Sequence, residues 1–193
     1  MGKRVFFNYV FIIAFNSMNY LIIPGFNGSG PDHWQTFWEN SLQGEIVRVL
    51  QDDWTNPNCK AWTQKLDDDI NKCKEPPVLI AHSLGCITVV QWAFNYHSKK
   101  VKAAFLVAPA DVEHLKNEKF NSFSPIPLFR LPFLSVLVAS TNDPYADIGR
   151  SAQFAAYWGS KFNSVGNLGH INADSGIGNW PEGQKLLDEL INY

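Results

Sequence analysis

Residues 81–85 form the pentapeptide Ala-His-Ser-Leu-Gly, in which small side chains stand two positions before and after Ser83. The short apolar run 78–80 precedes it, and apolar residues at helical spacing follow it from Ile87 to Phe94. A strand, a sharp turn and a helix in this order hold a serine hydroxyl clear of a parallel sheet, where large flanking side chains would collide. Backbone N–H groups at the start of the helix can stabilise negative charge. The pattern therefore indicates a serine nucleophile.

Two residues downstream could activate this serine. A serine hydroxyl is a weak nucleophile and needs a base, most often a histidine that a carboxylate orients. Asp143 follows the apolar run 133–139, and His170 follows the strand-like segment 162–165. Serine, acid and histidine in this chain order are typical of α/β-hydrolases, whose sheets bind ligands beyond the carboxyl ends of their strands. We predict a catalytic triad of Ser83, Asp143 and His170.

Other residues of the same types fit these roles less well. Asp147 is the alternative acid, but the helix expected over 146–158 would turn it away from the site. The remaining histidines lie before the serine, directly beside it, or without a suitable acid in the required order: His33, His82, His97 and His114. A packing or surface position is the simpler interpretation of His33, and a solvent-facing one that of His97. His82 cannot easily turn round to act as the base, and His114 could line a pocket.

A glycine-rich loop, 24–30, follows the first expected strand, 20–23. Its glycines do not form the G-x-G-x-x-G spacing of dinucleotide sites, and G-K-[ST] is absent, so phosphate binding is the weaker alternative. We interpret the segment as an oxyanion loop, because glycine lets a backbone N–H approach the substrate closely. The expected donors are the N–H groups of Phe26 and of Leu84, which follows the nucleophile.

Strands and helices alternate along the chain, as a parallel sheet requires. Six segments have the apolar character of strands: 20–23, 45–50, 78–80, 101–108, 133–139 and 162–165. Helical patterns separate or follow them: 32–42, 56–70, 84–96, 146–158 and 181–191. The predicted fold class is α/β, a minimal α/β-hydrolase with a mostly parallel sheet of about six strands and helices on both faces.

The first helical pattern, 32–42, supports a competing function. Asp32 is the expected N-cap, because Gln35 follows it three residues later. One face of this helix is strongly apolar: Trp34, Phe37, Trp38 and Leu42. This aromatic face could serve a non-catalytic protein-interaction module built on the same fold. The complete triad argues against that alternative, since a scaffold needs none of its three residues.

The composition is that of one compact domain, with 46% hydrophobic and 18% charged residues in a chain of 193. A net charge of −2 provides no basic face for nucleic acid. The three cysteines favour a reducing compartment over a disulfide framework, and we interpret Cys86 as a small buried apolar residue. No Cys and His spacing is typical of metal ligands, so we expect neither a metal nor a cofactor.

The first 17 residues are expected to be an appendage outside a single domain of 18–193. Lys3 and Arg4 followed by the apolar run 5–15 resemble a secretory signal, and export is the alternative. Asn8 interrupts the run, no small-x-small cleavage site follows, and the run is too short to span a bilayer as a helix. We therefore predict a cytoplasmic protein without a membrane partner.

The segment 109–131, between two expected strands, is too short for the lid of a lipase. Its aromatic residues can supply a few walls of a small pocket, and its prolines limit how far it opens. We expect Asn27, His82 and Phe123 to line this substrate pocket.

These motifs together resemble the small serine hydrolases grouped with retinoblastoma-binding protein nine and the bacterial YdeN-like proteins. The resemblance covers roughly residues 18–191 and rests on the following segments: Pro24-Gly25-Phe26, His33-Trp34, Asp53-Trp54 with Pro57 and Trp62, the turn at Ser83, 140–145, and 169–183. It implies an α/β-hydrolase of minimal size whose triad maps onto Ser83, Asp143 and His170. The chain departs from the pattern at residues 1–17, which have no counterpart, and at Ala81, where glycine is commoner.

Two details of the resemblance bear on binding. We interpret Asp53 and Trp54 as a capping carboxylate and a packing indole rather than as ligand contacts. The association of the family with the retinoblastoma protein involves an L-x-C-x-E peptide, and the corresponding stretch here, 84–88, lacks the acid. The residues therefore predict a carboxylesterase-like serine hydrolase or amidase that acts on small acyl substrates through an acyl-enzyme.

Overall fold

The structure is a computed structural model that describes residues 18–96 and 100–192. The expected appendage, 1–17, and His97 lie outside the described residues. The strands are β1 (Asn19–Ile23), β2 (Glu45–Arg48), β3 (Val78–His82), β4 (Ala103–Val107), β5 (Leu134–Ala139) and β6 (Lys161–Ser164). The helices are α1 (Trp34–Ser41), α2 (Cys59–Lys72), α3 (Leu84–Tyr96), α4 (Ile148–Trp158) and α5 (Pro181–Ile191), with short 3₁₀ helices η1 (Glu118–Phe123) and η2 (Ala173–Ser175).

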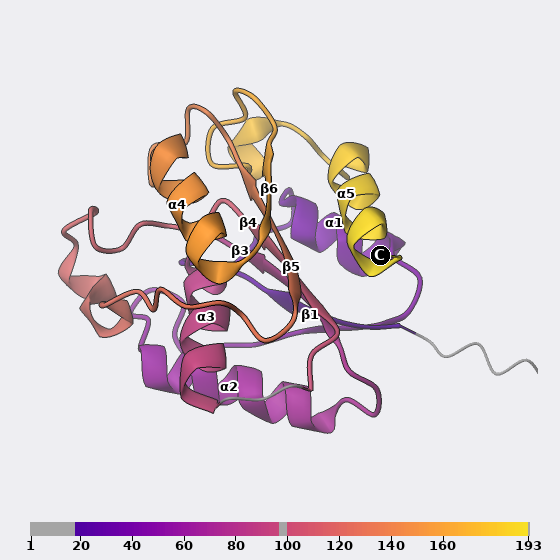
Figure 1. Cartoon of the computed structure of the whole chain (residues 1–193). Helices are drawn as coiled ribbons and strands as arrows, with labels where there is room; N and C mark the ends of the chain where they lie inside the picture. The colour runs from indigo at the N-terminus through magenta and orange to yellow at the C-terminus, as the bar shows by residue number, and fades with distance from the viewer. Residues whose placement is uncertain (1–17, 97–99, 193) are drawn as a thin grey trace, which may run out of the picture.

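The six strands form one sheet in the order β2-β1-β3-β4-β5-β6, and every neighbouring pair is parallel. From β1 the chain moves outward to β2, then returns to β3 and continues to the opposite edge (Figure 1). The connections that follow β1 and β3 therefore diverge at the carboxyl edge. Open α/β sheets bind their ligands at such a point. The predicted parallel sheet of about six strands is confirmed.

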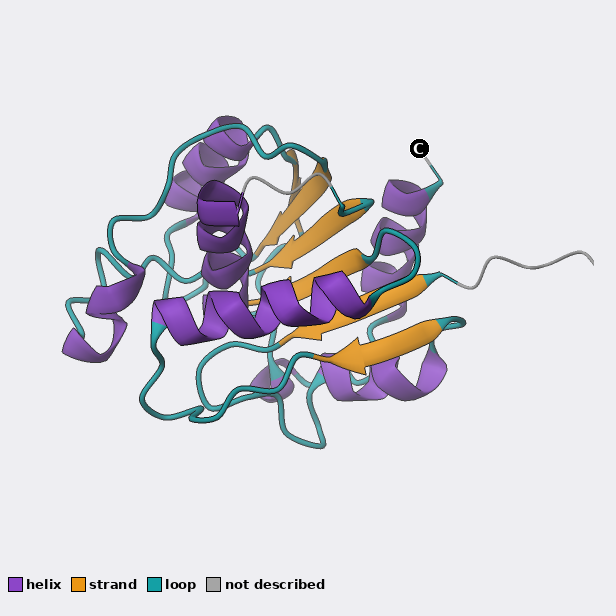
Figure 2. Cartoon of the chain, turned by 90° about the horizontal axis from the view of Figure 1, so that it is seen from below, coloured by secondary structure: helices purple, strands orange, loops and turns teal. Residues whose placement is uncertain are grey.

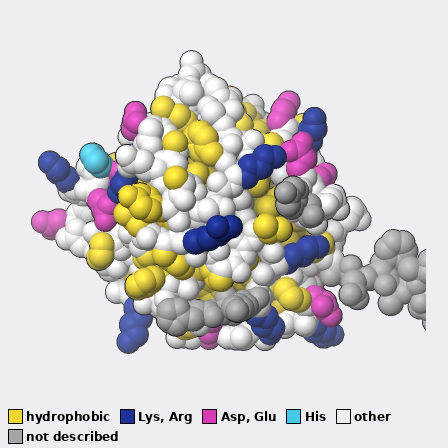
Figure 3. Space-filling model, viewed as in Figure 1, with side chains coloured by type: hydrophobic (Ala, Val, Ile, Leu, Met, Phe, Trp, Pro, Cys, Tyr) yellow, Lys and Arg dark blue, Asp and Glu magenta, His cyan; other side chains and the backbone are white. Residues whose placement is uncertain are grey.

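Helices cover both faces of the sheet (Figure 1, Figure 2). On one face, Leu21 and Leu79 pack with the apolar sides of α2, α3 and α4. On the other face, Ile22 and Ile80 pack with α1 and α5. Successive strand residues point to opposite faces, and both are covered, so every residue of β1, β3 and β4 is buried. Basic and acidic side chains are interspersed on the face shown in Figure 3.

Helix α1 differs from its predicted form at both its start and its exposed side. Its N-cap is His33, whose side chain accepts a hydrogen bond from the Gln35 N–H, rather than Asp32. Trp34 and Trp38 are both 0% exposed, while Phe37 is 38% exposed. The two tryptophans are therefore part of the core, and Phe37 is the aromatic side chain of this helix that reaches the surface. The interaction-module alternative thus lacks most of the aromatic surface that it needs.

In the segment after β2, Asp53 caps backbone N–H groups and Trp54 packs against another indole, as expected. The Asp53 carboxylate accepts hydrogen bonds from the side-chain amide of Asn56 and from the backbone N–H groups of Thr55 and Asn56. These hydrogen bonds hold the pKa of Asp53 well below its usual range, because they stabilise the ionised form. The Trp54 ring packs edge-on against Trp62 at a centroid distance of 5.5 Å. No helix in the described ranges is long and apolar enough to cross a membrane.

Candidate active site

The turn between β3 and α3 has the geometry that the pentapeptide predicts. Ser83 has a φ of 55°, in the left-handed region that costs energy for a residue with a side chain. A Cβ on Gly85 would collide with the carbonyl group of Ile23, which explains why a small residue is needed there. Ala81 is completely buried under the turn. Ser83 therefore stands on a strained turn above the sheet, directly before a helix N-terminus.

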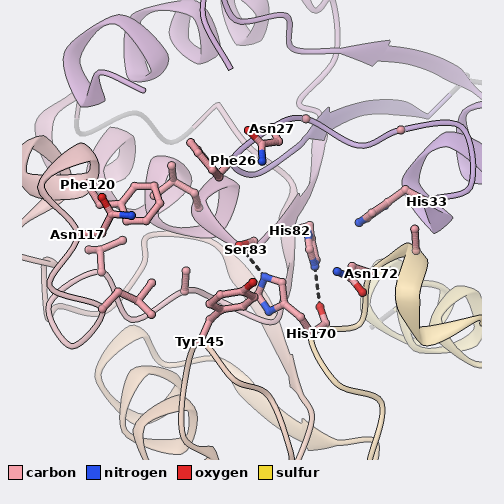
Figure 4. A pocket seen from close by; sticks show the side chains of 17 residues that line it. Phe26, Asn27, His33, His82, Ser83, Asn117, Phe120, Tyr145, His170 and Asn172 are labelled. Carbon is pink, nitrogen blue, oxygen red and sulfur yellow. Dashed lines mark hydrogen bonds between the residues drawn. The ribbon is translucent and has the colours of Figure 1, made fainter. Parts of the chain in front are cut away.

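The structure brings the three predicted triad residues together. His170 Nε2 lies 2.8 Å from Ser83 Oγ (Figure 4). On the other side of the ring, His170 Nδ1 lies 2.9 Å from Asp143 Oδ2. The side chains of His170 and Asp143 are 8% and 3% exposed. Because a carboxylate can only accept, Nδ1–H donates to Asp143, which leaves the Nε2 lone pair to accept the serine hydroxyl. This tautomer is the one a general base needs.

The loops that carry the acid and the base are tied to each other. Ser140 Oγ accepts a hydrogen bond from the Leu168 N–H, and Asn142 Oδ1 accepts one from the Gly169 N–H. The two side chains also contact each other, at 2.8 Å. His170 is held further through its carbonyl group, to which His82 Nε2–H donates at 2.9 Å. Neither Ser140 nor Asn142 was an expected site residue, although both lie in a segment that carries the family resemblance.

Asp147 occupies another position than the triad acid. It is the N-cap of α4, and its Oδ1 accepts a hydrogen bond from the Gly149 N–H at 2.7 Å. Its carboxylate is therefore engaged at the start of the helix, and Asp143 is the acid that contacts His170.

The two expected oxyanion donors lie beside the serine. A Cβ on Gly25 would lie 2.8 Å from Ser83 Cβ and 3.1 Å from the Leu84 nitrogen, so the loop after β1 passes very close to the turn. Leu84 is the first residue of α3, where N–H groups have no acceptor within the helix. Among the described residues, neither Phe26 nor Leu84 donates a backbone hydrogen bond outside the regular elements. Both N–H groups are available to a ligand.

A cavity of about 500 Å³ opens over Ser83 and His170. Asn27 and His82 line it, as expected. Phe123 does not, which corrects the sequence-based expectation: it is 0% exposed and packs against Trp62 at a centroid distance of 5.7 Å. Phe120, one turn earlier in η1, lines the cavity in its place.

Two further histidines, His33 and His82, lie beside His170. The ring centroids of His33 and His82 are 4.7 Å apart, and those of His82 and His170 are 4.8 Å apart. Burial lowers the pKa of His33 to about 4, and the charges of Arg48 and His170 act in the same direction. Burial also lowers the pKa of His82 well below its ordinary value. Both rings are therefore neutral near pH 7. His33 was not among the residues expected to line the cavity, yet it does so.

Across residues 18–96 and 100–192, no three His, Cys, Asp or Glu side chains gather as a metal site would require. Burial raises the pKa of the Cys86 thiol, which agrees with its interpretation as a packed apolar residue.

Comparisons with known proteins place this geometry in context. A family model described as serine hydrolase matches residues 20–189. A YdeN-like hydrolase from Pectobacterium atrosepticum is 28% identical, with a TM-score of 0.81 and 91% of each chain covered. The ydeN gene product from B. subtilis is 18% identical, with a TM-score of 0.76, covering 92% of this chain and 100% of that one. The esterase domain of a Rhodothermus marinus protein is 17% identical, with a TM-score of 0.71, covering 94% and 90%. No curated protein sequence matches the chain.

Proposed function

The chain belongs to the serine hydrolase family, as its motifs predicted, and we propose that it hydrolyses small acyl esters through an acyl-enzyme on Ser83. It is an esterase-like enzyme of the α/β-hydrolase type. The observation that carries the proposal is the continuous contact from Ser83 Oγ through the His170 ring to the Asp143 carboxylate.

In the first half of the reaction, His170 Nε2 takes the proton from Ser83 Oγ as the oxygen attacks the ester carbonyl carbon. Asp143 keeps the ring in the required tautomer and stabilises the imidazolium cation that forms. The N–H groups of Phe26 and Leu84 donate to the carbonyl oxygen as it becomes an oxyanion. His170 then gives its proton to the departing alcohol, and the acyl group stays on Ser83.

In the second half, water replaces the alcohol. His170 Nε2 takes a proton from the water as its oxygen attacks the acyl carbon, and the same N–H groups hold the second oxyanion. When this intermediate collapses, the proton passes to Ser83 Oγ and the carboxylic acid leaves. An amide would follow the same path with an amine as the leaving group.

The segment 109–131 supports a small substrate. It contains one short helix, η1, and Phe120 from this helix forms part of the cavity wall. Arg150 ties the segment to α4 through ion pairs with Asp111 and Glu113. Glu113 also accepts a hydrogen bond from the Ile126 N–H, which closes the segment on itself. A wall held in this way suits a pocket of fixed size rather than a mobile lipase lid.

A fluorophosphonate probe tests the proposal directly, because it phosphonylates an activated serine without needing the true substrate. We expect one adduct per chain, mapped to Ser83 by peptide mass spectrometry, and no adduct in Ser83→Ala. Ser164→Ala, an exposed serine of β6, is the matched control and should be labelled like the parent protein. Labelling that persists in Ser83→Ala, for example at Ser140 or Ser175, would overturn the assignment of the nucleophile.

A further inference from the structure

The cavity over Ser83 has two chemically different ends. The end formed by the segment 109–131 is mostly apolar: Phe120 and Leu115 line it, with the amide of Asn117 beside them. His33 and Asn172 line the opposite end, and Figure 4 shows them across the cavity from Phe120, with Ser83 between the two groups. A substrate with its carbonyl group at Ser83 must therefore extend one arm over apolar side chains and the other toward polar ones.

The hydrogen bond at the start of α1 determines which nitrogen of His33 carries the proton. The Gln35 N–H donates to His33 Nδ1 at 3.2 Å, so Nδ1 holds a lone pair. Because burial keeps the ring neutral, its one proton is on Nε2. His33 is 5% exposed, and Nε2 has no hydrogen-bond partner among the described residues. His33, which lines the polar end of the cavity, thus carries a buried donor that has no acceptor among the described residues.

Capping of α1 does not explain this donor. A cap needs only an acceptor atom, and Asn, Asp, Ser or Thr would supply one without leaving a second polar atom unpaired. Buried donors are nearly always paired in native proteins, because an unpaired one loses its hydrogen bonds to water. An acceptor brought by a ligand would pair Nε2–H.

The cavity also restricts the charge of that ligand. In the part of the chain that the structure describes, no Lys, Arg, Asp or Glu lines it. Its polar side chains there are imidazoles, hydroxyls and amides. Arg48, whose charge acts on His33, does not line the cavity and is already paired with Glu39. Away from the N–H groups at Ser83, no described side chain is thus free to compensate an ionised ligand removed from water. The acceptor that meets His33 is therefore an uncharged oxygen.

We propose that His33 Nε2–H donates a hydrogen bond to an uncharged ether, hydroxyl or carbonyl oxygen of the substrate. This inference rests on the proposed function. The substrate is then a neutral ester with an apolar arm against Phe120 and an oxygen-bearing arm toward His33. His33 determines specificity and takes no part in the chemical steps.

The test compares esters of equal length that differ by one atom. In p-nitrophenyl alkanoates, each methylene of the acyl chain is replaced in turn by an ether oxygen. A second series makes the same replacement in the alcohol of butyrate esters, followed by acid release. We expect kcat/KM to favour one ether position over its alkyl counterpart by roughly tenfold, the size of one hydrogen bond that would otherwise be lost.

Two variants separate the donor of His33 from its cap. Asn supplies an acceptor near the position of Nδ1 but no group at Nε2, whereas Gln supplies an amide N–H near Nε2 but no good cap. We expect His33→Asn to remove the ether preference while keeping the melting temperature. His33→Gln should keep the ether preference while melting at a lower temperature.

The outcomes distinguish this inference from the proposed function. If the parent protein reacts with the fluorophosphonate at Ser83 but prefers no ether position, or if His33→Asn keeps the preference, the inference is wrong and the proposed function stands. If the parent protein neither reacts with the probe nor hydrolyses any ester, both are wrong.

Discussion

The close approach of Gly25 to Ser83 allows the oxyanion loop to be tested by adding one carbon atom. In Gly25→Ala, the new Cβ would lie 2.8 Å from Ser83 Cβ, 3.0 Å from the His82 carbonyl oxygen and 3.1 Å from the Leu84 nitrogen. The backbone at Gly25 is not in the left-handed region, so alanine adds no torsional strain of its own. The effect of the substitution is therefore steric.

The size of the effect follows from these distances. The contact with Ser83 Cβ is about 0.6 Å shorter than the 3.4 Å at which ordinary contact begins, and the other two atoms belong to rigid backbone. Relief must move the Phe26 N–H away from the oxyanion or Ser83 away from His170. Loss of one oxyanion donor lowers kcat by about 10² to 10³, or roughly 3–4 kcal/mol of transition-state stabilisation. We expect a loss of kcat/KM of about 10²-fold, with a decrease in stability of about 1–3 kcal/mol from overpacking.

The assay is hydrolysis of p-nitrophenyl acetate, with thermal unfolding followed by circular dichroism to verify the fold. Gly30→Ala is the control, because it lies in the same loop and its new Cβ would have no atom within 4 Å. It should lose much less activity than Gly25→Ala. Equal activity of the two variants would refute the argument that the packing of this loop against the turn determines catalysis.

Three other predictions follow from the site. Asp143→Asn should lower kcat by about 10³ to 10⁴, because it favours the wrong tautomer of His170. Asp147→Asn should change stability more than kcat. The reverse pattern in steady-state kinetics would identify Asp147 as the acid. The free energy of unfolding should decrease by roughly 3 kcal/mol as the pH falls from about 6.5 to about 4, since His33 stays neutral in the folded chain while its unfolded form takes up a proton. His82 adds to this pH dependence. In denaturant titrations, the stability of His33→Asn should depend less steeply on pH. Among simple alkyl esters, kcat/KM should rise or stay level from acetyl to about butyryl or hexanoyl and then fall, because each further methylene gains about 0.8 kcal/mol only if the cavity buries it. A preference for palmitate esters, or activation by micelles, would contradict a pocket of fixed size.

Local patterns were sufficient to predict the sheet and the convergence of Ser83, Asp143 and His170. The turn at Ser83 is encoded within five residues, and the acid and base follow strands that are recognisable on their own. A parallel sheet then places all three at one edge, so their convergence needs no knowledge of distant contacts.

Features that depend on distant contacts were predicted incorrectly. Asp32 and Gln35 match the spacing of a capping box, but the Gln35 side chain is buried and donates to the carbonyl groups of Ile23 and Ile80. That leaves His33, whose ring packs against His82, to cap α1. The choice between Phe120 and Phe123 at the cavity depends in the same way on where α2 places Trp62.

The indole groups of α1 have a consequence for folding. Trp34 Nε1–H donates to the carbonyl group of Ile171, and Trp38 Nε1–H donates to that of Asn179. These contacts join segments 137 and 141 residues apart, and Ile171 follows His170 directly. Contacts of such sequence separation carry a large entropic cost of loop closure and tend to form late. Hydrolytic activity should therefore appear only with the last long-range contacts of folding, so recovered activity would report completion of the native state better than recovered helix content.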